Sequence, residues 1–509
     1  MTDLLTALLA SCDRTPDAPA ITLGSRTLTY GQLRERIEGL ATALTAEGLA
    51  QGDRVLFSVR PGLDAVTLAL GIIAAGGTVV FADPGAGEAM FRARAALAAP
   101  KWVAAESLLY AASSGPLRSI ARRRGIELPD YGTVVPDARH IYTGPWLPGV
   151  PKGALPLRRW SSRSHSDRIE TRSTPGFDTP SRLLNHREAL IIFTSGTTAR
   201  PKAVVHSRSS LGTGLDDFAR LVGFLPGERV LTDQLMVGIP ALISGAHWVM
   251  PPAGADPGAK PAAYLDLLPT ADVLFAVPAA LDALLRMLEL TPTKTPNLRA
   301  LLIGGAPVLR PLLLRARAQL PRTAVRAIYG MTEILPVAIA DGDEKLAFDG
   351  PGDYVGEIMP TIDARIVDGE LVLCGEGLAG YLGEPAVEEL RTGDLARIEG
   401  DRLVLAGRSK DMFIRGTTNV YPGLYEPVIA GIPGVEQAAI VGLPDSIGDD
   451  SIVLAVVLSK GGTVEQVRRA LPGLIDSAVM PDRIVVMDQF PTSGRSAKLD
   501  RAALTAQLA

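Results

Sequence analysis

Cysteine and histidine are too scarce in this 509-residue chain to build a metal cluster or a disulfide framework. The sequence holds two cysteines, Cys12 and Cys374, and five histidines that are scattered and never closely paired. A structural zinc site needs four such ligands, usually at short spacings, and a disulfide scaffold needs more cysteines than these. We therefore expect neither, and we take a cytoplasmic enzyme as the default class.

A continuous membrane-spanning stretch and an excess of positive charge are also missing. The apolar stretch 65–82 is interrupted by Gly71, Gly76 and Gly77, which favours a buried helix followed by a buried strand over a membrane span. The first residues lack the basic start and the longer apolar run of a secretory signal, and they predict an amphipathic helix. The formal net charge of −4 gives no reason to expect a nucleic-acid partner.

The length of 509 residues exceeds what one compact core accommodates, so we expect at least two domains. Up to about residue 340, short runs rich in Val, Ile and Leu alternate with glycine turns and helical patterns. This alternation predicts parallel sheets that are covered by helices on both faces. The predicted strand and strand–helix segments are 53–59, 77–83, 189–196, 272–288 and 298–308.

The pattern changes after residue 340. Residues 355–375 and 395–408 alternate apolar and polar side chains around Asp-Gly and Gly-Asp turns, which predicts antiparallel hairpins. A unit of mixed pattern follows them. Its predicted elements are a helix near 424–431, strands near 435–443 and 451–459, a helix near 463–476 and a strand near 482–488.

The predicted fold class is therefore α/β. A large N-terminal domain over residues 1–406 combines parallel-sheet α/β subdomains with a β-rich subdomain, and a small α+β domain follows over 407–509. The polar, Arg- and Ser-rich run 158–173 fits neither pattern. A solvated loop is the simpler interpretation of this run, and a basic surface that steers an anionic substrate or partner is the alternative.

The strongest local motif follows the apolar strand in residues 191–207. Small hydroxylated residues and glycine come directly after the strand, and a Pro-Lys pair comes next. Hydroxyl and backbone N–H donors of such a loop can surround phosphate oxygens, while the lysine supplies a positive charge. An ordinary Ser/Thr-rich turn is the competing interpretation, and the Walker spacing is absent. The residues concerned are Thr194, Ser195, Gly196, Thr197, Thr198 and Lys202.

This segment resembles the phosphate loop of the adenylate-forming superfamily, which comprises acyl-CoA synthetases, nonribosomal-peptide adenylation domains and luciferases. The resemblance continues, in the order that the family has, over nearly the whole chain. The segment GGAP is similar to the loop that lies against adenine, and YGMTE is similar to the family's Y-G-x-T-E. The matching residues are Gly304, Gly305, Ala306 and Pro307, followed by Tyr329, Gly330, Met331, Thr332 and Glu333.

The resemblance implies a role for each of these side chains. Tyr329 would stack on adenine, Thr332 would contact the α-phosphate, and Glu333 would help to hold Mg²⁺. An aromatic face suits a base, and a carboxylate suits a hard cation.

Three later motifs complete the resemblance. RTGDLARI carries Asp394, which would accept hydrogen bonds from the ribose hydroxyls. GRSKDMFIRG carries Arg408, a second ribose and phosphate contact, and Lys410, at the hinge of the mobile small domain. GRSAKLDR carries Lys498, which is similar to the family's catalytic lysine.

The resemblance implies an ATP- and Mg²⁺-dependent enzyme that converts a carboxylic acid to an acyl-adenylate, releases pyrophosphate, and passes the acyl group to an acceptor. CoA is the family's default acceptor. A non-catalytic nucleotide-binding protein is the alternative from another class, and the joint presence of the charged motif residues argues against it. A kinase of another fold would release ADP instead.

Several departures from the family pattern bear on the acceptor. Thr417 stands where thioester-forming members carry a glycine that lets the pantetheine thiol pass close to the backbone, so it argues against an ordinary CoA channel. Ala497 replaces the glycine that usually precedes the catalytic lysine. Small and aliphatic side chains within 233–252 stand where a His or aromatic residue usually gates the acyl pocket.

The segment 329–338 resembles the E-x-L-P-V form of β-lactone synthetases, whereas 415–423 resembles enzymes of actinobacterial secondary metabolism, some of which activate nitrite. CoA-independent fates therefore stay open: lactone formation, amide ligation or nitrite-activating diazotisation. The expected partners are a small-molecule acid and, after activation, a carrier or a downstream biosynthetic enzyme.

Overall fold

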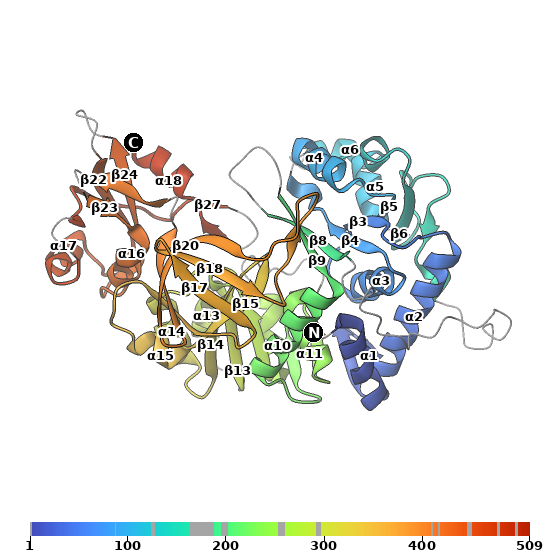
Figure 1. The fold of residues 1–509 in the computed structure, drawn as a ribbon, viewed down its shortest axis with the longest axis horizontal. Helices are drawn as coiled ribbons and strands as arrows, with labels where there is room; N and C mark the ends of the chain where they lie inside the picture. The colour runs from blue at the N-terminus through green and yellow to red at the C-terminus, as the bar shows by residue number, and fades with distance from the viewer. Residues whose placement is uncertain are drawn as a thin grey trace. The chain divides into compact units, whose positions relative to one another are not determined.

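The computed structural model describes residues 3–86, 88–123, 128–161, 188–194, 202–252, 260–291, 297–408, 411–415, 418–444, 450–475, 479–493 and 497–509. The chain divides into two compact units (Figure 1). Unit 1 comprises Met1–Gly254, Thr332–Leu335 and Glu376–Val387, and unit 2 comprises Ala255–Met331, Pro336–Gly375 and Glu388–Ala509.

Unit 1 contains an eight-stranded sheet in the order β19-β9-β8-β4-β3-β5-β6-β7. Its neighbouring strands from β8 to β7 pair in parallel, as predicted, while β9 pairs antiparallel with both β8 and β19. The strands are β3 (Arg54–Ser58), β4 (Thr78–Phe81), β5 (Trp102–Glu106), β6 (Arg139–Thr143), β7 (Leu155–Pro156), β8 (Glu188–Thr194), β9 (Lys202–Ser207) and β19 (Gly380–Tyr381).

A second group of strands in unit 1 joins segments that lie far apart in the sequence. Strands β10, β11 and β1 pair in parallel, and β2 closes the group in the antiparallel direction. The strands are β1 (Pro19–Leu23), β2 (Arg26–Thr29), β10 (Arg229–Leu231) and β11 (His247–Met250).

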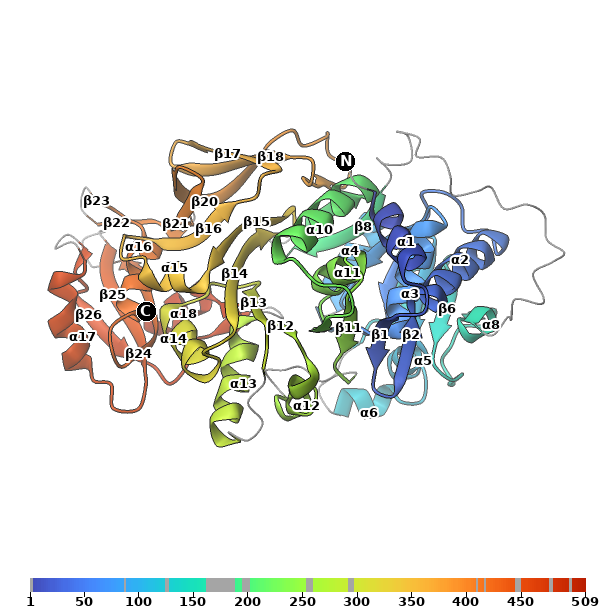
Figure 2. The ribbon, with the colours of Figure 1, turned by 90° about the horizontal axis from the view of Figure 1, so that it is seen from below.

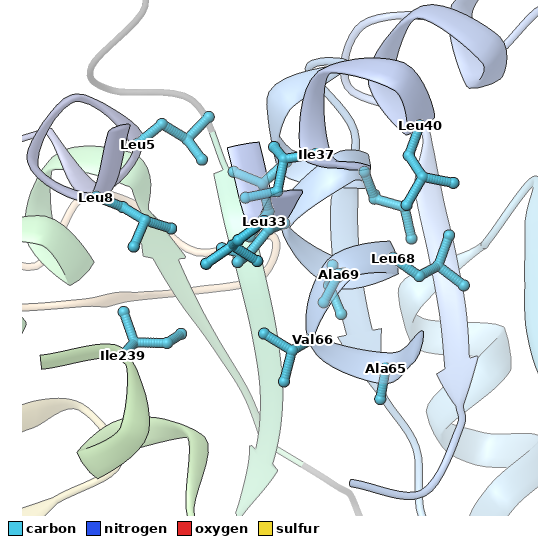
Figure 3. Close-up of a cluster of buried hydrophobic side chains, with 14 of the residues drawn as sticks. Leu5, Leu8, Leu33, Ile37, Leu40, Ala65, Val66, Leu68, Ala69 and Ile239 are labelled. Carbon is cyan, nitrogen blue, oxygen red and sulfur yellow. The ribbon is translucent and has the colours of Figure 1, made fainter. Parts of the chain in front are cut away.

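The helices of unit 1 bury apolar faces in a common core. The predicted amphipathic first helix is α1, which buries Leu4, Leu5 and Leu8, and Leu5 and Leu8 appear with the core side chains of α2 and α3 in Figure 3. The helices are α1 (Leu4–Arg14), α2 (Tyr30–Ala46), α3 (Leu63–Ala74), α4 (Glu88–Ala98), α5 (Ser107–Ser113), α6 (Arg118–Arg123), α7 (Tyr131–Val134), α8 (Arg158–Ser161), α10 (Arg208–Val222) and α11 (Leu235–Ile243), with a 3₁₀ turn at Pro84–Ala86.

The apolar stretch 65–82 forms α3 and β4, as predicted. Gly71 lies where α3 crosses α2, and a Cβ atom there would lie 2.7 Å from the Cβ of Leu40. In the described residues, no helix combines the length and apolar character that crossing a membrane requires. Of the Arg- and Ser-rich run, residues 162–173 lie outside the described residues; its start is α8, in which Trp160 is buried.

Unit 2 has strands in the order β17-β18-β20-β21-β16-β15-β14-β13-β12, with β15 belonging to it from Pro336 onward. Strands β12, β13 and β14 are parallel, and helices α13 and α14 lie beside them (Figure 2). The strands are β12 (Val273–Ala276), β13 (Ala300–Gly304), β14 (Ala324–Met331), β15 (Ile334–Asp341), β16 (Asp353–Ile358), β17 (Ile362–Val367), β18 (Glu370–Gly375), β20 (Leu390–Glu399) and β21 (Arg402–Arg408).

The predicted hairpins are present with one correction. Strands β17 and β18 meet through Asp368 and Gly369, both at positive φ, and β20 and β21 meet through a Gly-Asp turn. Positive φ at both central residues is what a tight two-residue turn requires. The first strand of the segment 355–375 is not part of its hairpin, because β16 pairs with β15 and β21 instead.

The C-terminal part of unit 2 is the small α+β domain that the sequence predicts. Its strands are β22 (Phe413–Arg415), β23 (Thr418–Val420), β24 (Val435–Pro444), β25 (Asp450–Leu458), β26 (Arg483–Val486), β27 (Thr492–Ser493) and β28 (Lys498–Leu499). The helices of unit 2 are α12 (Ala262–Leu265), α13 (Pro278–Leu290), α14 (Arg310–Gln319), α15 (Gly342–Ala347), α16 (Pro422–Ala430), α17 (Val464–Ala470) and α18 (Arg501–Leu508), with 3₁₀ turns at Leu268–Thr270 and Leu471–Gly473.

The helix predicted near 463–476 is too long. The α-helix ends at Ala470 and continues as a 3₁₀ turn over Leu471–Gly473. Pro472 explains the end, because proline lacks the N–H that a continuing α-helix would donate to the carbonyl of Arg468. The domain boundary at 406/407 stays a prediction.

The contact at Gly71 makes the packing of α2 on α3 testable. Gly71→Ala should lower the free energy of unfolding by about 1–2 kcal/mol, because overpacking against Leu40 outweighs the better helix propensity of alanine. Gly132→Ala is the control, since a Cβ there meets its nearest neighbour at an ordinary 3.5 Å. Urea denaturation followed by circular dichroism measures both, and a Gly71→Ala variant as stable as the control variant would contradict the packing argument.

Candidate functional site

A pocket of about 570 Å³ in unit 2 collects most of the residues predicted to bind the nucleoside. Its walls come from the end of β13, the end of β14, the β20–β21 hairpin and the β27–β28 hairpin. The predicted residues that line it are Gly305, Ala306, Pro307, Tyr329, Gly330, Asp394, Arg408 and Lys498. Gly304 and Met331 end β13 and β14 next to lining residues.

The carboxylate of Asp394 is the best-connected group in this pocket. Its side chain is 6% exposed and forms an ion pair with Arg408, which lies directly opposite it on β21. The hydroxyl of Tyr329 donates a hydrogen bond of 2.5 Å to Asp394 Oδ2. The backbone N–H of Asp394 donates a hydrogen bond to Thr392 Oγ1 within the same strand.

Burial dominates the electrostatics of this cluster. It raises the pKa of Asp394 above the ordinary value, although Arg408, the Tyr329 hydrogen bond and Lys498 all stabilise the ionised form. Burial and the nearby Asp394 also raise the pKa of Tyr329, so its hydroxyl stays a donor. The partners therefore offset part of the cost of burying the charged carboxylate.

Lys498 reaches the same pocket from the β27–β28 hairpin. Partial loss of surrounding water beside the pocket lowers the pKa of Lys498, and so does repulsion by Arg408, while attraction by Asp394 partly offsets both. Ala497, the departure from the family's glycine, has φ of 46°. This is the left-handed region, which glycine occupies without cost and alanine does not.

A second group of predicted residues lies in unit 1. Thr194 ends β8 and pairs with Lys202 at the start of β9, so the two ends of the predicted phosphate loop are adjacent. The Lys202 ammonium lies 5.0 Å from the centre of the Tyr381 ring. The hydroxyl of Tyr381 donates a 3.0 Å hydrogen bond to Glu333 Oε1. The loop residues Ser195, Gly196, Thr197 and Thr198, and also Lys410 and Thr417, lie outside the described residues.

His206 anchors the Thr332–Glu333 segment to β9. Its Nε2 donates to the carbonyl oxygen of Thr332 at 2.7 Å, and its side chain is buried. Burial lowers the pKa of His206, so the ring is neutral with its proton on Nε2. The sequence analysis missed both His206 and Tyr381. A histidine at a core-facing position of a strand was the signal that could have indicated His206. Tyr381 stands in an isolated Gly-Tyr pair, which gives no such signal.

Glu333 suits Mg²⁺ when other ligands complete the shell. The described residues contain no group of three or more His, Cys, Asp or Glu side chains that could hold a metal by themselves. Mg²⁺ typically takes one or two carboxylates and fills its remaining positions with phosphate oxygens and water. A single glutamate that shares Tyr381 with Lys202, at the end of the predicted phosphate loop, fits this requirement.

Comparison with protein families gives the class. Residues 8–383 match the AMP-binding enzyme family, and residues 425–498 match the AMP-binding enzyme C-terminal domain. The chain therefore belongs to a family of adenylate-forming enzymes. It belongs to the AMP-binding enzyme family, a family of AMP-forming ligases that bind ATP and activate an acid by adenylation.

Individual relatives differ in what their names imply. Phenyloxazoline synthase MbtB of Mycobacterium tuberculosis is 29% identical over 97% of this chain, which spans only 34% of that protein. Feruloyl-CoA synthase of Amycolatopsis is 28% identical, with 94% of each chain covered.

Two solved structures have the same fold. They are amide bond synthetase McbA from Marinactinospora thermotolerans (TM-score 0.78, 21% identity, 99% of each chain) and apo MatB from Rhodopseudomonas palustris (TM-score 0.77, 24% identity, 100% of this chain and 99% of that one). They confirm the predicted fold class and leave the acceptor open.

The raised pKa of Asp394 predicts a specific pH dependence. Protonation turns one acceptor oxygen of Asp394 into an O–H donor and removes the charge that strengthens the predicted ribose hydrogen bonds. We therefore expect kcat/KM for ATP to fall on acidification from a higher pH than an ordinary Asp, with pKa about 3.9, would give. Asp394→Asn should lower kcat/KM for ATP roughly 10- to 150-fold at neutral pH, because it loses charge-assisted bonds. The variant should also show a weaker fall of kcat/KM on acidification than the parent.

Asp401→Asn, in the exposed turn between β20 and β21, is the matched control and should behave like the parent enzyme. Steady-state kinetics from pH 5 to neutrality measures all three proteins. If the Asp394→Asn variant loses kcat/KM on acidification in the same way as the parent, the group that titrates is not Asp394.

Proposed function

We propose that the chain joins a carboxylic acid to AMP through the residues of these two groups, and that Lys498 is the catalytic lysine. The observation that carries the proposal is that Lys498 lines one pocket together with Tyr329, Asp394 and Arg408. These are the side chains that the reaction needs at the ribose and at the α-phosphate.

The nucleoside roles follow from the hydrogen bonds in unit 2. Tyr329 is held through its hydroxyl by Asp394, so its ring offers adenine a fixed aromatic face beside the Gly305–Pro307 loop. The Asp394 carboxylate has about four lone-pair sites, and its two partners leave room for ribose hydroxyls. Arg408 is charged and partly exposed, so it can contact ribose and phosphate together.

In the reaction, an oxygen of the acid attacks the α-phosphorus in line, the new O–P bond forms, and the bond to pyrophosphate breaks. Lys498 stabilises the charge that develops on the α-phosphate oxygens, and Thr332 donates its hydroxyl to the same group. Most of the rate enhancement comes from such positioning and charge stabilisation. Lys202 and the hydroxyl loop from Thr194 to Thr198 bind the outer phosphates. Glu333 would hold Mg²⁺, which neutralises charge on those phosphates.

The small domain, residues 407–509 in this proposal, turns about a hinge at Lys410 between the two half-reactions. An ion pair of 3.0 Å between Arg286 on α13 and Glu436 on β24 joins the small domain to the rest of unit 2. The turn must break this pair. The Arg286–Glu436 contact therefore belongs to the arrangement in which Lys498 occupies the nucleotide pocket.

CoA is the proposed acceptor by family default, and the feruloyl-CoA synthase likeness supports it. The second candidate is a CoA-independent fate such as amide or lactone formation, or nitrite activation, and Thr417 favours it. The MbtB likeness supports delivery to a carrier. Pyrophosphate release with a panel of acids that includes nitrite, assayed with and without CoA, separates these fates. AMP release that matches product without CoA would end the CoA proposal, and ATP binding without turnover on any acid would favour the non-catalytic alternative.

Removal of the lysine tests the catalytic assignment. Lys498→Ala should lower pyrophosphate release at least 100-fold, roughly the 3–4 kcal/mol expected when a key oxyanion donor is lost. Lys460→Ala is the control and should match the parent, because Lys460 is an exposed lysine in the turn that follows β25. A Lys498→Ala rate within threefold of the parent would remove Lys498 from the mechanism.

A further inference from the structure

Tyr381 contacts two oppositely charged residues of unit 1 with different parts of its side chain. The ring face receives the Lys202 ammonium at 5.0 Å from the ring centre, and the hydroxyl donates to Glu333 Oε1 at 3.0 Å. Within the described residues, these two charged groups meet on Tyr381 and form no direct ion pair with each other.

The backbone around Tyr381 is fixed to both segments that carry these charges. Tyr381 pairs with Val204 on β9, and the N–H of Leu382 is bonded to the carbonyl of Ala203. On the other side, the N–H of Ala379 is bonded to the carbonyl of Glu333 at 2.8 Å. Position 381 is therefore set by strand pairing with the lysine's strand and by a backbone bond to the glutamate.

The ammonium and the carboxylate of this cluster attract each other, although the exposed position of Lys202 lets water weaken the attraction. A direct pair would use the same carboxylate oxygens and the same ammonium that ligands need. A tyrosine ring instead attracts the ammonium through its face, and a single hydrogen bond engages only one of the carboxylate's roughly four lone-pair sites.

We propose that Tyr381 is a positioning residue that keeps Lys202 and Glu333 apart before ATP binds, which leaves the glutamate available to Mg²⁺ and the lysine available to phosphate. The inference rests on the function proposed above for these two residues. It assigns Tyr381 a role in how tightly the Mg²⁺–nucleotide complex binds, and none in acid recognition.

Two substitutions separate the two contacts. Tyr381→Phe keeps the ring for Lys202 and removes the hydroxyl from Glu333, whereas Tyr381→Leu removes both. Tyr354→Phe is the matched control, because the Tyr354 hydroxyl makes the same kind of bond, 2.8 Å to Glu344, elsewhere in the molecule. Each protein is titrated calorimetrically with α,β-methylene-ATP at several Mg²⁺ concentrations in the absence of acid, and its thermal midpoint is recorded.

Tyr381→Phe should raise the half-saturating Mg²⁺ concentration about tenfold, the lower end of what a hydrogen bond to a charged group contributes. Its affinity for the analogue at saturating Mg²⁺ should change little. Tyr381→Leu should in addition weaken that affinity roughly 2- to 5-fold, the range of a cation–π contact at an exposed site. KM for the acid should stay within twofold of the parent in both variants, and the control should match the parent throughout.

Unchanged Mg²⁺ dependence in Tyr381→Phe, with the parent binding the analogue normally, would overturn the inference and leave the proposed function intact. A parent that shows no Mg²⁺-dependent binding would instead overturn the roles proposed for Lys202 and Glu333. Equal losses of thermal midpoint and of all binding parameters in both variants would reduce Tyr381 to a structural residue. If Tyr381→Leu fails to fold, the Mg²⁺ dependence of Tyr381→Phe alone tests the inference.

Discussion

The pocket in unit 2 depends on one constraint: Asp394 is an ionisable carboxylate that is only 6% exposed. Burying such a group is costly unless partners satisfy it. Here the partners come from separate strands, with Tyr329 at the end of β14 and Arg408 opposite on β21. The register of β20 on β21 and the end point of β14 are therefore part of the site, and Lys498 completes the balance of charge from the small domain.

The residues of the motif YGMTE belong to both units. Tyr329–Met331 belong to unit 2 with the nucleoside residues, and Thr332 and Glu333 belong to unit 1 with Lys202 and Tyr381. In the proposed mechanism unit 2 recognises the nucleoside and supplies the catalytic lysine, while unit 1 carries the charges that meet the outer phosphates and Mg²⁺. His206 and Ala379 hold the unit 1 half of the motif through its backbone carbonyls.

Local patterns in the sequence predicted the elements that depend on local chemistry. The Asp368–Gly369 hairpin, the α3–β4 interpretation of the apolar stretch and the α+β character of the small domain are all confirmed. The helix predicted near 463–476 ends early, at Ala470, because Pro472 cannot donate the next backbone hydrogen bond. The pairing of β16 with β15 and β21 could not be foreseen, because it depends on strand order rather than on a turn.

The candidate site likewise contains residues that local motifs reveal and residues that they do not. Motifs with their own spacing, such as those around Tyr329, Asp394 and Lys498, could be found in the sequence, and the structure brings these three into one pocket. Tyr381 could not be found, since its contacts exist only because β19 pairs with β9 across a long separation in sequence. The acceptor also escapes prediction, because Thr417 argues against an ordinary CoA channel without identifying another acceptor.

Hydrogen–deuterium exchange with and without α,β-methylene-ATP tests most directly whether the buried Asp394 cluster is the nucleoside site. The account predicts slower exchange at 305–307, 329–331 and 392–394 when the analogue and Mg²⁺ are present, with little change in the core strands β3 and β5. Slower exchange confined to other segments, with 329–331 and 392–394 unaffected, would contradict it.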